Sequence, residues 1–332
     1  SPVLSIVKSC VILVAVIMER EIFLHVYSHE KVGFMTTDIL IVGSGCAGLY
    51  AALHLPKEKA VTIITKAEAE SSDSFLAQGG MCMLKEPDDY DSYFEDTLKA
   101  GHYENDRTSV DIMMHSSQDV VKDLESYGVR FQKDESGAFV FTREGGHSEK
   151  RILFHKDITG KEITSKLLEQ VKMLSNVTVL EYTTLLDIIE EDQECYGAII
   201  RHKDGKVERV EADYVVMATG GVGGLYRHST NFRQLTGDAI AIAMKHGIEL
   251  KNVDYIYNNQ TFNSLFEFED DKSYVFKDCI FQAGVSCHQH FLVFRQNRFL
   301  ALRTPVPLRS VFRRRFCIYI SNGIHIKYNS RR

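Results

Sequence analysis

Three glycines in one short segment have the spacing of a phosphate-binding turn. They lie in Gly43-Ser-Gly-Cys-Ala-Gly48, between an apolar strand-like run and a helix-like run. In such a turn Gly43 permits a tight bend, Gly45 lets the backbone approach a pyrophosphate, and Gly48 lets helix and strand pack closely. The free N–H groups of the helix N-terminus then favour negative charge. The segment predicts a dinucleotide site; a glycine-rich turn without function is the alternative.

A lysine follows the next strand-like run. Residues 60–65 form a second β-branched run, and Lys66 stands where an NAD-binding unit usually carries Asp or Glu for the ribose hydroxyls. NAD is therefore disfavoured as the first-bound nucleotide. Two interpretations of Lys66 stay open, a donor to an adenosine ribose and a solvated lysine at a strand end.

Two polar loops are further candidates for binding. Residues 71–80 are rich in small polar side chains and glycine, so their backbone could lie against a flavin or a phosphate, although most polar loops only connect elements. Residues 137–151 are the densest polar cluster and place Arg143, Glu144 and His147 around two glycines. That set suits a site for a small polar substrate, and a surface turn with an ion pair fits equally well.

A parallel sheet is needed to position these motifs. The apolar runs 38–42 and 212–218 predict two strands of one sheet, each ending in a glycine-rich turn, and residues 203–206 predict a hairpin turn. Helices are expected at 88–101, 109–128, 161–174 (capped by the Thr159 hydroxyl) and 235–247, and strands at 177–180, 185–189, 196–201 and 207–210. The order predicts an α/β fold, a Rossmann-type nucleotide-binding domain with inserted hairpin and helical elements.

Composition narrows the classes of protein. The 332-residue chain has a net charge of −6, which gives no reason to expect a nucleic-acid partner. From Cys279 to Arg332, however, there are nine Arg, one Lys and no acidic residue. The seven scattered cysteines predict reduced thiols and a cytoplasmic location, with neither disulfides nor a metal site. The apolar run 10–18 is short for a membrane span and lacks a convincing cleavage site, so Met35 is expected to be the natural start.

The order of the motifs closely resembles the flavoprotein subunit superfamily of fumarate reductase, succinate dehydrogenase and L-aspartate oxidase. Between about residues 35 and 255, the matching pieces are the turn at Gly43, Ala77-Gln-Gly-Gly80, Ala218-Thr-Gly-Gly221 and Thr236-Gly-Asp238. Members with covalent flavin carry a His just ahead of the Ala-Gln-Gly-Gly element, where this chain has Asp73-Ser-Phe-Leu76. Thr142-Arg-Glu-Gly-Gly-His-Ser148 resembles the L-aspartate oxidase branch.

This resemblance implies a non-covalent FAD cofactor and a defined set of site residues. The implied FAD contacts are Gly43, Ser44, Gly45, Cys46, Ala47 and Gly48 around the pyrophosphate, Lys66 near the adenosine ribose, Asp73, Ser74, Phe75, Leu76, Ala77, Gln78, Gly79 and Gly80 along the flavin, and Asp238. Glu144 is implied to orient L-aspartate through its ammonium group. The implied reaction oxidises L-aspartate to iminoaspartate with O₂ or fumarate as acceptor. It would be the first step of NAD synthesis, with iminoaspartate handed over to quinolinate synthase.

The chain also departs from the family pattern. The family's His-Pro-Thr segment does not follow Asp254-Tyr-Ile256, and its later substrate arginines have no recognisable counterpart in residues 279–332. We expect residues 1–34 to be an upstream extension without a fold role, residues 35–252 an FAD-binding domain, and residues 253–332 the start of a truncated or aberrant capping domain that ends as a basic tail. A fumarate reductase or succinate dehydrogenase flavoprotein and a non-catalytic FAD-binding fragment remain as alternatives.

Overall fold

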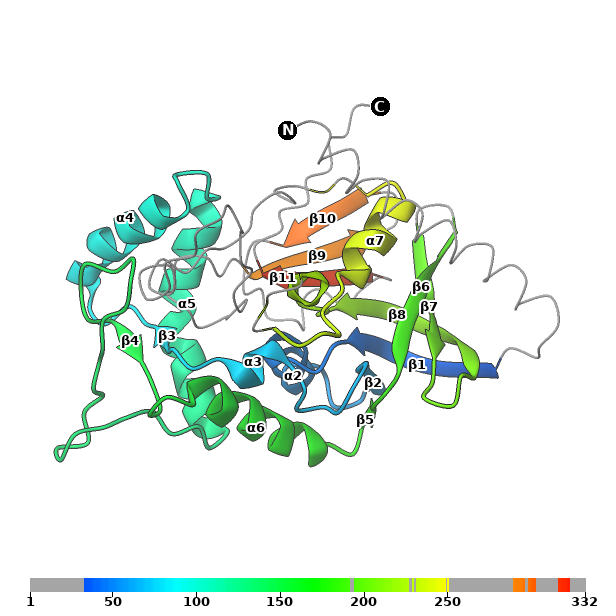
Figure 1. Ribbon diagram of the computed structural model, residues 1–332, viewed down its shortest axis with the longest axis horizontal. Helices are drawn as coiled ribbons and strands as arrows, with labels where there is room; N and C mark the ends of the chain where they lie inside the picture. The colour runs from blue at the N-terminus through cyan, green and yellow to red at the C-terminus, as the bar shows by residue number, and fades with distance from the viewer. Residues whose placement is uncertain are drawn as a thin grey trace.

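A parallel sheet forms the centre of the computed structural model. The model describes residues 33–191, 194–226, 229, 231–248 and 250, and the strands at 289–295, 298–302 and 316–322. The middle strand β1 (Gly33–Val42) lies between β8 (Val207–Met217) and β2 (Val61–Ile64), and β5 (Val177–Leu180) pairs with β2 (Figure 1). Because all these neighbours pair in parallel, their carboxyl ends form one edge of the sheet.

Both faces of this sheet are covered, as the near-continuous apolar runs require. Successive side chains of a strand point to opposite faces, so Ile39 and Ile41 join one hydrophobic cluster while Leu40 and Val42 join another. The first cluster packs against helices α2 (Cys46–Leu53), α5 (Arg107–Ser126) and α6 (Thr159–Lys172). The second packs against β6 (Thr184–Glu191), β7 (Glu194–Arg201) and α7 (Asp238–Lys245).

A smaller body lies beside the sheet and carries the second polar loop. Its elements are α3 (Asp73–Leu76), β3 (Met81–Cys82), the 3₁₀ turn η1 (Pro87–Asp89), α4 (Tyr90–Ala100), the N-terminal part of α5, and β4 (Ile152–Leu153). Strands β3 and β4 pair antiparallel, and Tyr93, Leu98, Val110 and Met114 form a third buried cluster beneath them. In Figure 1, β3, β4, α4 and α5 lie on the side of the molecule away from the hairpin β6–β7, and α3 lies next to α2.

The predicted α/β fold is confirmed, with the predicted hairpin between β7 and β8 and a second 3₁₀ turn, η2 (Gly223–Leu225), after β8. Strand β1 begins at Gly33, ahead of the expected residue 38, because residues 33–37 pair with residues 208–212 of β8. The capping prediction for Thr159 is wrong. Its hydroxyl accepts a hydrogen bond from the His155 amide at 2.9 Å, and Ile158 stands at the N-cap of α6 without a side-chain bond.

Much of the predicted terminal organisation lies outside the described residues. Residues 1–32 and most of residues 253–332 belong to this part of the chain. Strands β9 (Gln289–Arg295), β10 (Arg298–Leu302) and β11 (Phe316–Asn322) extend the central sheet, with β11 parallel to β8. Among the described residues, no helix is long and apolar enough to cross a membrane.

Candidate functional site

The glycine turn after β1 lies at the carboxyl edge of the sheet, against the end of β8. Gly43 has a φ of +113°, and a Cβ atom there would lie 2.1 Å from the carbonyl oxygen of Ala218. The Ala218 amide donates to the Val42 carbonyl at 2.8 Å, and the Gly43 amide donates to the Ile64 carbonyl at 2.8 Å. Only glycine permits this conformation and this approach, so the turn is fixed between two strand ends.

The helix that follows the turn presents free backbone amides. A Cβ atom on Gly48 would lie 2.0 Å from the Gly43 carbonyl oxygen, which explains the third glycine of the motif. Gly45 caps α2 without a side chain, and the Cys46 amide donates to the Ser74 hydroxyl at 3.1 Å. The next two amides, of Ala47 and Gly48, belong to the first helical turn and have no intrahelical acceptor. This arrangement is suited to an anionic group.

A cavity opens in front of the glycine turn and Ala47, with a volume of about 930 Å³ when its open mouth is included. Of the residues implied to contact FAD, those that line it are Gly43, Ser44, Gly45, Ala47, Lys66, Asp73, Ser74 and Asp238. Thr219 also lines it, and its buried hydroxyl has no hydrogen-bond partner in the described part of the chain. A bound ligand with polar atoms would supply that partner, so the lining fits a nucleotide cofactor.

Lys66 is paired across this cavity. Its Nζ lies 2.6 Å from Asp238 Oδ2 and donates to the Thr236 hydroxyl at 2.6 Å and to the Gln234 carbonyl at 3.1 Å. The structure therefore joins the two cofactor residues predicted on β2 and α7. Lys66 is partly buried and ion-paired, which differs from a solvated strand-end lysine.

The loop from Asp73 to Gly80 runs from the cavity towards β3. The buried Asp73 carboxylate accepts from the Phe232 amide at 2.9 Å and from the Asn231 side chain, so it anchors the strand-to-helix segment before α7. Gly160 of α6 packs closely beneath, because its amide donates to the Ala77 carbonyl at 2.9 Å. Several predicted contacts do not line the cavity, namely Cys46, Gly48, Phe75, Leu76, Ala77, Gln78, Gly79 and Gly80.

Glu144 lies at the far end of that loop. A Cβ atom built on Gly79 would be 3.1 Å from Glu144 Oε2, so the carboxylate sits directly against the glycine. Within the described part of the chain, this carboxylate makes no hydrogen bond or ion pair. Burial raises the pKa of Glu144 above its ordinary value. A half-buried carboxylate without a counter-charge attracts a cationic group.

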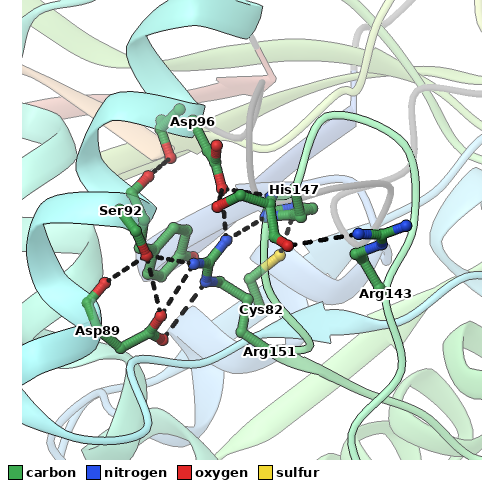
Figure 2. A network of polar contacts seen from close by, with 10 residues as sticks. Cys82, Asp89, Ser92, Asp96, Arg143, His147 and Arg151 are labelled. Carbon is green, nitrogen blue, oxygen red and sulfur yellow. Dashed lines mark hydrogen bonds and ion pairs between the residues drawn. The ribbon is translucent and has the colours of Figure 1, made fainter.

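Two members of the polar cluster, His147 and Arg151, are buried, whereas Arg143, Ser148, Glu149 and Lys150 are exposed. Arg151 is fully buried and pairs with Asp89 and Asp96, and His147 is 7% exposed between Arg151 and Cys82 (Figure 2). The cluster is therefore more than a surface turn with an ion pair. The two glycines at 145 and 146 are exposed, and a Cβ atom on Gly145 would meet nothing within 4 Å.

Sequence reasoning missed part of the cavity lining. Thr183 and Leu185 line it from the start of β6, and Gln234 and Leu235 line it from the segment before α7. No motif marks these four residues. Thr219 follows β8 inside the glycine-rich turn, and that turn was the one signal in the sequence that could have identified it.

Comparisons with known proteins agree with this geometry. The model of the FAD binding domain family matches residues 38–261. The L-aspartate oxidase of Clostridium perfringens is 43% identical over 224 residues, which are 68% of this chain and 51% of that protein. That of Bacillus subtilis is 36% identical over 220 residues, which are 65% of this chain and 41% of that protein. The resemblance to the N-terminal part of L-aspartate oxidases is confirmed.

Solved structures share the same fold. A variant of the quinol fumarate reductase flavoprotein of E. coli superposes with a TM-score of 0.66 at 27% identity, over 68% of this chain and 39% of that one. The Sdh1 complex of Mycobacterium smegmatis with UQ1 gives 0.63 at 27% identity, over 68% and 41%. The chain spans about half the length, or less, of the curated relatives it matches. With the glycine turn, the cavity and the family match in agreement, the chain belongs to the FAD binding domain family.

Proposed function

We propose that this chain is part of an FAD-dependent oxidase that converts L-aspartate to iminoaspartate. The substrate loses a hydride from Cα and a proton from nitrogen, and the two electrons pass to O₂, giving H₂O₂, or to fumarate, giving succinate. The L-aspartate oxidase relatives support the substrate, and the family match supports FAD.

The observation that carries the proposal is the position of Glu144. Its carboxylate lies against Gly79 in the loop that leads to the cofactor cavity, and the described residues offer it no cation. L-Aspartate differs from succinate only by its α-ammonium group. A half-buried carboxylate in contact with the substrate would therefore distinguish the two compounds, because only the amino acid supplies the missing charge.

The chain's own residues divide the work of holding cofactor and substrate. The glycine turn and the Ala47 amide would hold the pyrophosphate, and Lys66 with Asp238 would hold the adenosine ribose, without a covalent link. Glu144 would hold the substrate ammonium group so that Cα faces the cofactor. Bound FAD supplies the hydride acceptor, which no amino-acid side chain can provide.

We infer the biological context from the same reaction. Iminoaspartate is the precursor that quinolinate synthase would consume, so the enzyme would supply the first step of NAD synthesis. Iminoaspartate hydrolyses readily in water, which favours direct handover to that partner.

Substitution of Glu144 tests the proposal. Purified FAD-loaded protein should release one H₂O₂ for each L-aspartate consumed in air, and Glu144→Gln should lose at least about tenfold of this activity while keeping FAD, because it removes the charge alone. Glu169→Gln is the control, since Glu169 is exposed and pairs with Lys166 on the surface of α6. Equal activity of Glu144→Gln and the unsubstituted chain would refute the assignment.

A fumarate reductase or succinate dehydrogenase flavoprotein is the second candidate. It is favoured by the solved structures of such proteins at 27% identity. Succinate discriminates between the two, because this candidate requires succinate to reduce the bound flavin and predicts no dependence on Glu144. A chain that binds FAD and responds to neither substrate would be a non-catalytic FAD-binding fragment.

A further inference from the structure

A buried ionic network lies beneath the loop that carries Glu144. Arg151 ends the loop, and its guanidinium reaches Asp96 Oδ2 at 2.6 Å, Asp89 Oδ1 at 2.8 Å and the Ser92 hydroxyl at 2.7 Å (Figure 2). These three partners belong to η1 and α4, and the Arg151 side chain is completely inaccessible to solvent. The loop is therefore attached to η1 and α4 through the buried, ion-paired guanidinium of Arg151.

Asp96 joins two positions of the same loop. Besides Arg151, its Oδ2 accepts from the amide and the hydroxyl of Ser148, both at 2.7 Å. These charge-assisted bonds hold the loop at two points on the C-terminal side of Glu144. They lower the pKa of Asp96, although burial acts in the opposite direction.

His147 joins this network to β3, the strand that follows residues 73–80. Its Nδ1 lies 3.2 Å from Arg151 Nη1, and its Nε2 lies 3.3 Å from Cys82 Sγ. A guanidinium group has only donors, so Nδ1 must accept and the imidazole proton must sit on Nε2. The ring is therefore neutral and points its N–H at the sulfur of Cys82.

The segment that contains Gly79 and the segment that contains Glu144 touch at two places. Gly79 and Cys82 belong to one segment, and Glu144 and His147 belong to the other. Glu144 meets Gly79, and three residues further along both segments His147 meets Cys82. The His147 contact therefore fixes the separation of the segments at which the Glu144 carboxylate lies against Gly79.

The base of the loop is also closed. The Thr142 amide donates to the Ile152 carbonyl at 3.0 Å, and the Ile152 amide donates to the Thr142 carbonyl at 3.1 Å. Ile152 belongs to β4, which pairs with β3, so the bridge continues into the strand that holds Cys82. With the base and the interior both fixed, Glu144 has little freedom to leave Gly79.

We propose that His147, Arg151 and Asp96 are positioning residues that hold the Glu144 carboxylate against Gly79 and so make the site select a substrate with an ammonium group. The inference rests on the proposed function. It goes further by assigning selectivity to three side chains that need not touch the substrate.

The experiment uses the full, FAD-loaded chain and follows the Glu144 carboxyl by ¹³C NMR, with the Glu144→Gln spectrum to assign its signal. His147→Leu removes the contacts of the ring nitrogens with Arg151 and Cys82. His147→Gln keeps one acceptor for Arg151 and one donor for Cys82, so it should restore the native behaviour. Asp96→Asn weakens the anchor on α4, and Asp119→Asn is its matched control on the exposed face of α5.

We expect the Glu144 carboxyl to titrate at lower pH in His147→Leu and Asp96→Asn than in the unsubstituted chain, because a released carboxylate is better hydrated. His147→Gln and Asp119→Asn should leave its titration unchanged. The preference for L-aspartate over succinate, read from perturbation of flavin absorbance, should fall at least about tenfold in the first two variants. Should either variant fail to fold, Ser148→Ala, which removes one exposed hydroxyl bond to Asp96, should show the same shift to a smaller extent.

Two outcomes separate this proposal from the proposed function. If L-aspartate does not perturb the flavin of the unsubstituted chain, the proposed function fails, and the NMR titration alone still tests the positioning. An unchanged titration of Glu144 in His147→Leu, Asp96→Asn and Ser148→Ala overturns the positioning role. The positioning role is also overturned if Glu144 titrates at the same pH in His147→Gln as in His147→Leu.

Discussion

Ser74 Oγ accepts a hydrogen bond from the backbone amide of Cys46 at 3.1 Å, across 28 positions of sequence. The loop that leads to Glu144 therefore supplies a side-chain acceptor for the first amide of α2, which Gly45 at the N-cap cannot provide. This contact joins the glycine turn and α2 to the loop of residues 73–80. A substitution in one of these two segments should therefore affect the other segment.

Ser74→Ala should lower the free energy of unfolding by about 1 kcal/mol, because a buried helix cap is lost. It should also weaken FAD binding, since α2 and the loop no longer hold each other. Urea unfolding and FAD titration measure the two effects. The control is Ser126→Ala, whose exposed hydroxyl donates to the Asp123 carbonyl in the last turn of α5 and whose loss should change stability by less than about 0.5 kcal/mol. Equal effects of both substitutions would contradict the capping role.

Gly43→Ala should prevent FAD binding and destabilise the fold by about 2–5 kcal/mol, because the added Cβ meets the Ala218 carbonyl and φ is positive. Gly137→Ala separates the two causes. Gly137 has a φ of +85° with nothing within 4 Å of the added atom, so only the conformational cost of about 1–2 kcal/mol remains. The account is wrong if thermal unfolding finds the two variants equally stable.

Lys66→Gln should weaken FAD binding about three- to tenfold by fluorescence titration, because the lysine links the end of β2 to Asp238 beside the cavity. Both side chains are about a quarter exposed, so stability should change by less than about 1 kcal/mol. Lys122→Gln, on an exposed pair with Asp119, provides the comparison and should leave FAD affinity unaltered.

His246 should stabilise the fold in a pH-dependent manner. Its hydrogen bond to Asp187 raises the pKa of His246 above its ordinary value, while Glu190 also attracts the protonated ring and Lys245 opposes it. A raised pKa means that the stabilisation is complete below the unfolded-state value of about 6.5 and is lost as pH rises through the folded-state value. His246→Gln should therefore cost more stability at about pH 6 than at about pH 9.

Urea unfolding at the two pH values measures this difference. His115→Gln serves as the control, because His115 is largely exposed on α5 beside Asp111. A cost for His246→Gln that does not change with pH would exclude the ion pair as its cause.

The sequence pattern predicted those helices, strands and turns whose conformation depends on residues adjacent in the sequence. The β-branched runs and the glycine spacing were enough for β1, the turn at Gly43 and the start of α2, because their conformations follow from residue type. Thr159 was wrongly expected to cap α6, since its hydroxyl instead accepts from the His155 amide. Residue types alone do not show whether the Thr159 hydroxyl accepts from an amide of the first helical turn or from the His155 amide.

Contacts between distant segments could not be predicted. The bond from the Asn231 side chain to Asp73 and the burial of Arg151 between Asp89 and Asp96 depend on how elements pack. In the sequence, Arg151 is one charged residue among several in a polar loop. Only the fold shows that the Arg151 side chain, unlike its charged neighbours Glu149 and Lys150, has no access to solvent.

The most direct test of the central claim is anaerobic mixing of the FAD-loaded chain with L-aspartate and, separately, with succinate. The account predicts that L-aspartate bleaches the oxidised flavin absorbance and that succinate does not. Bleaching by succinate, or bound flavin that stays oxidised with both compounds, would contradict it.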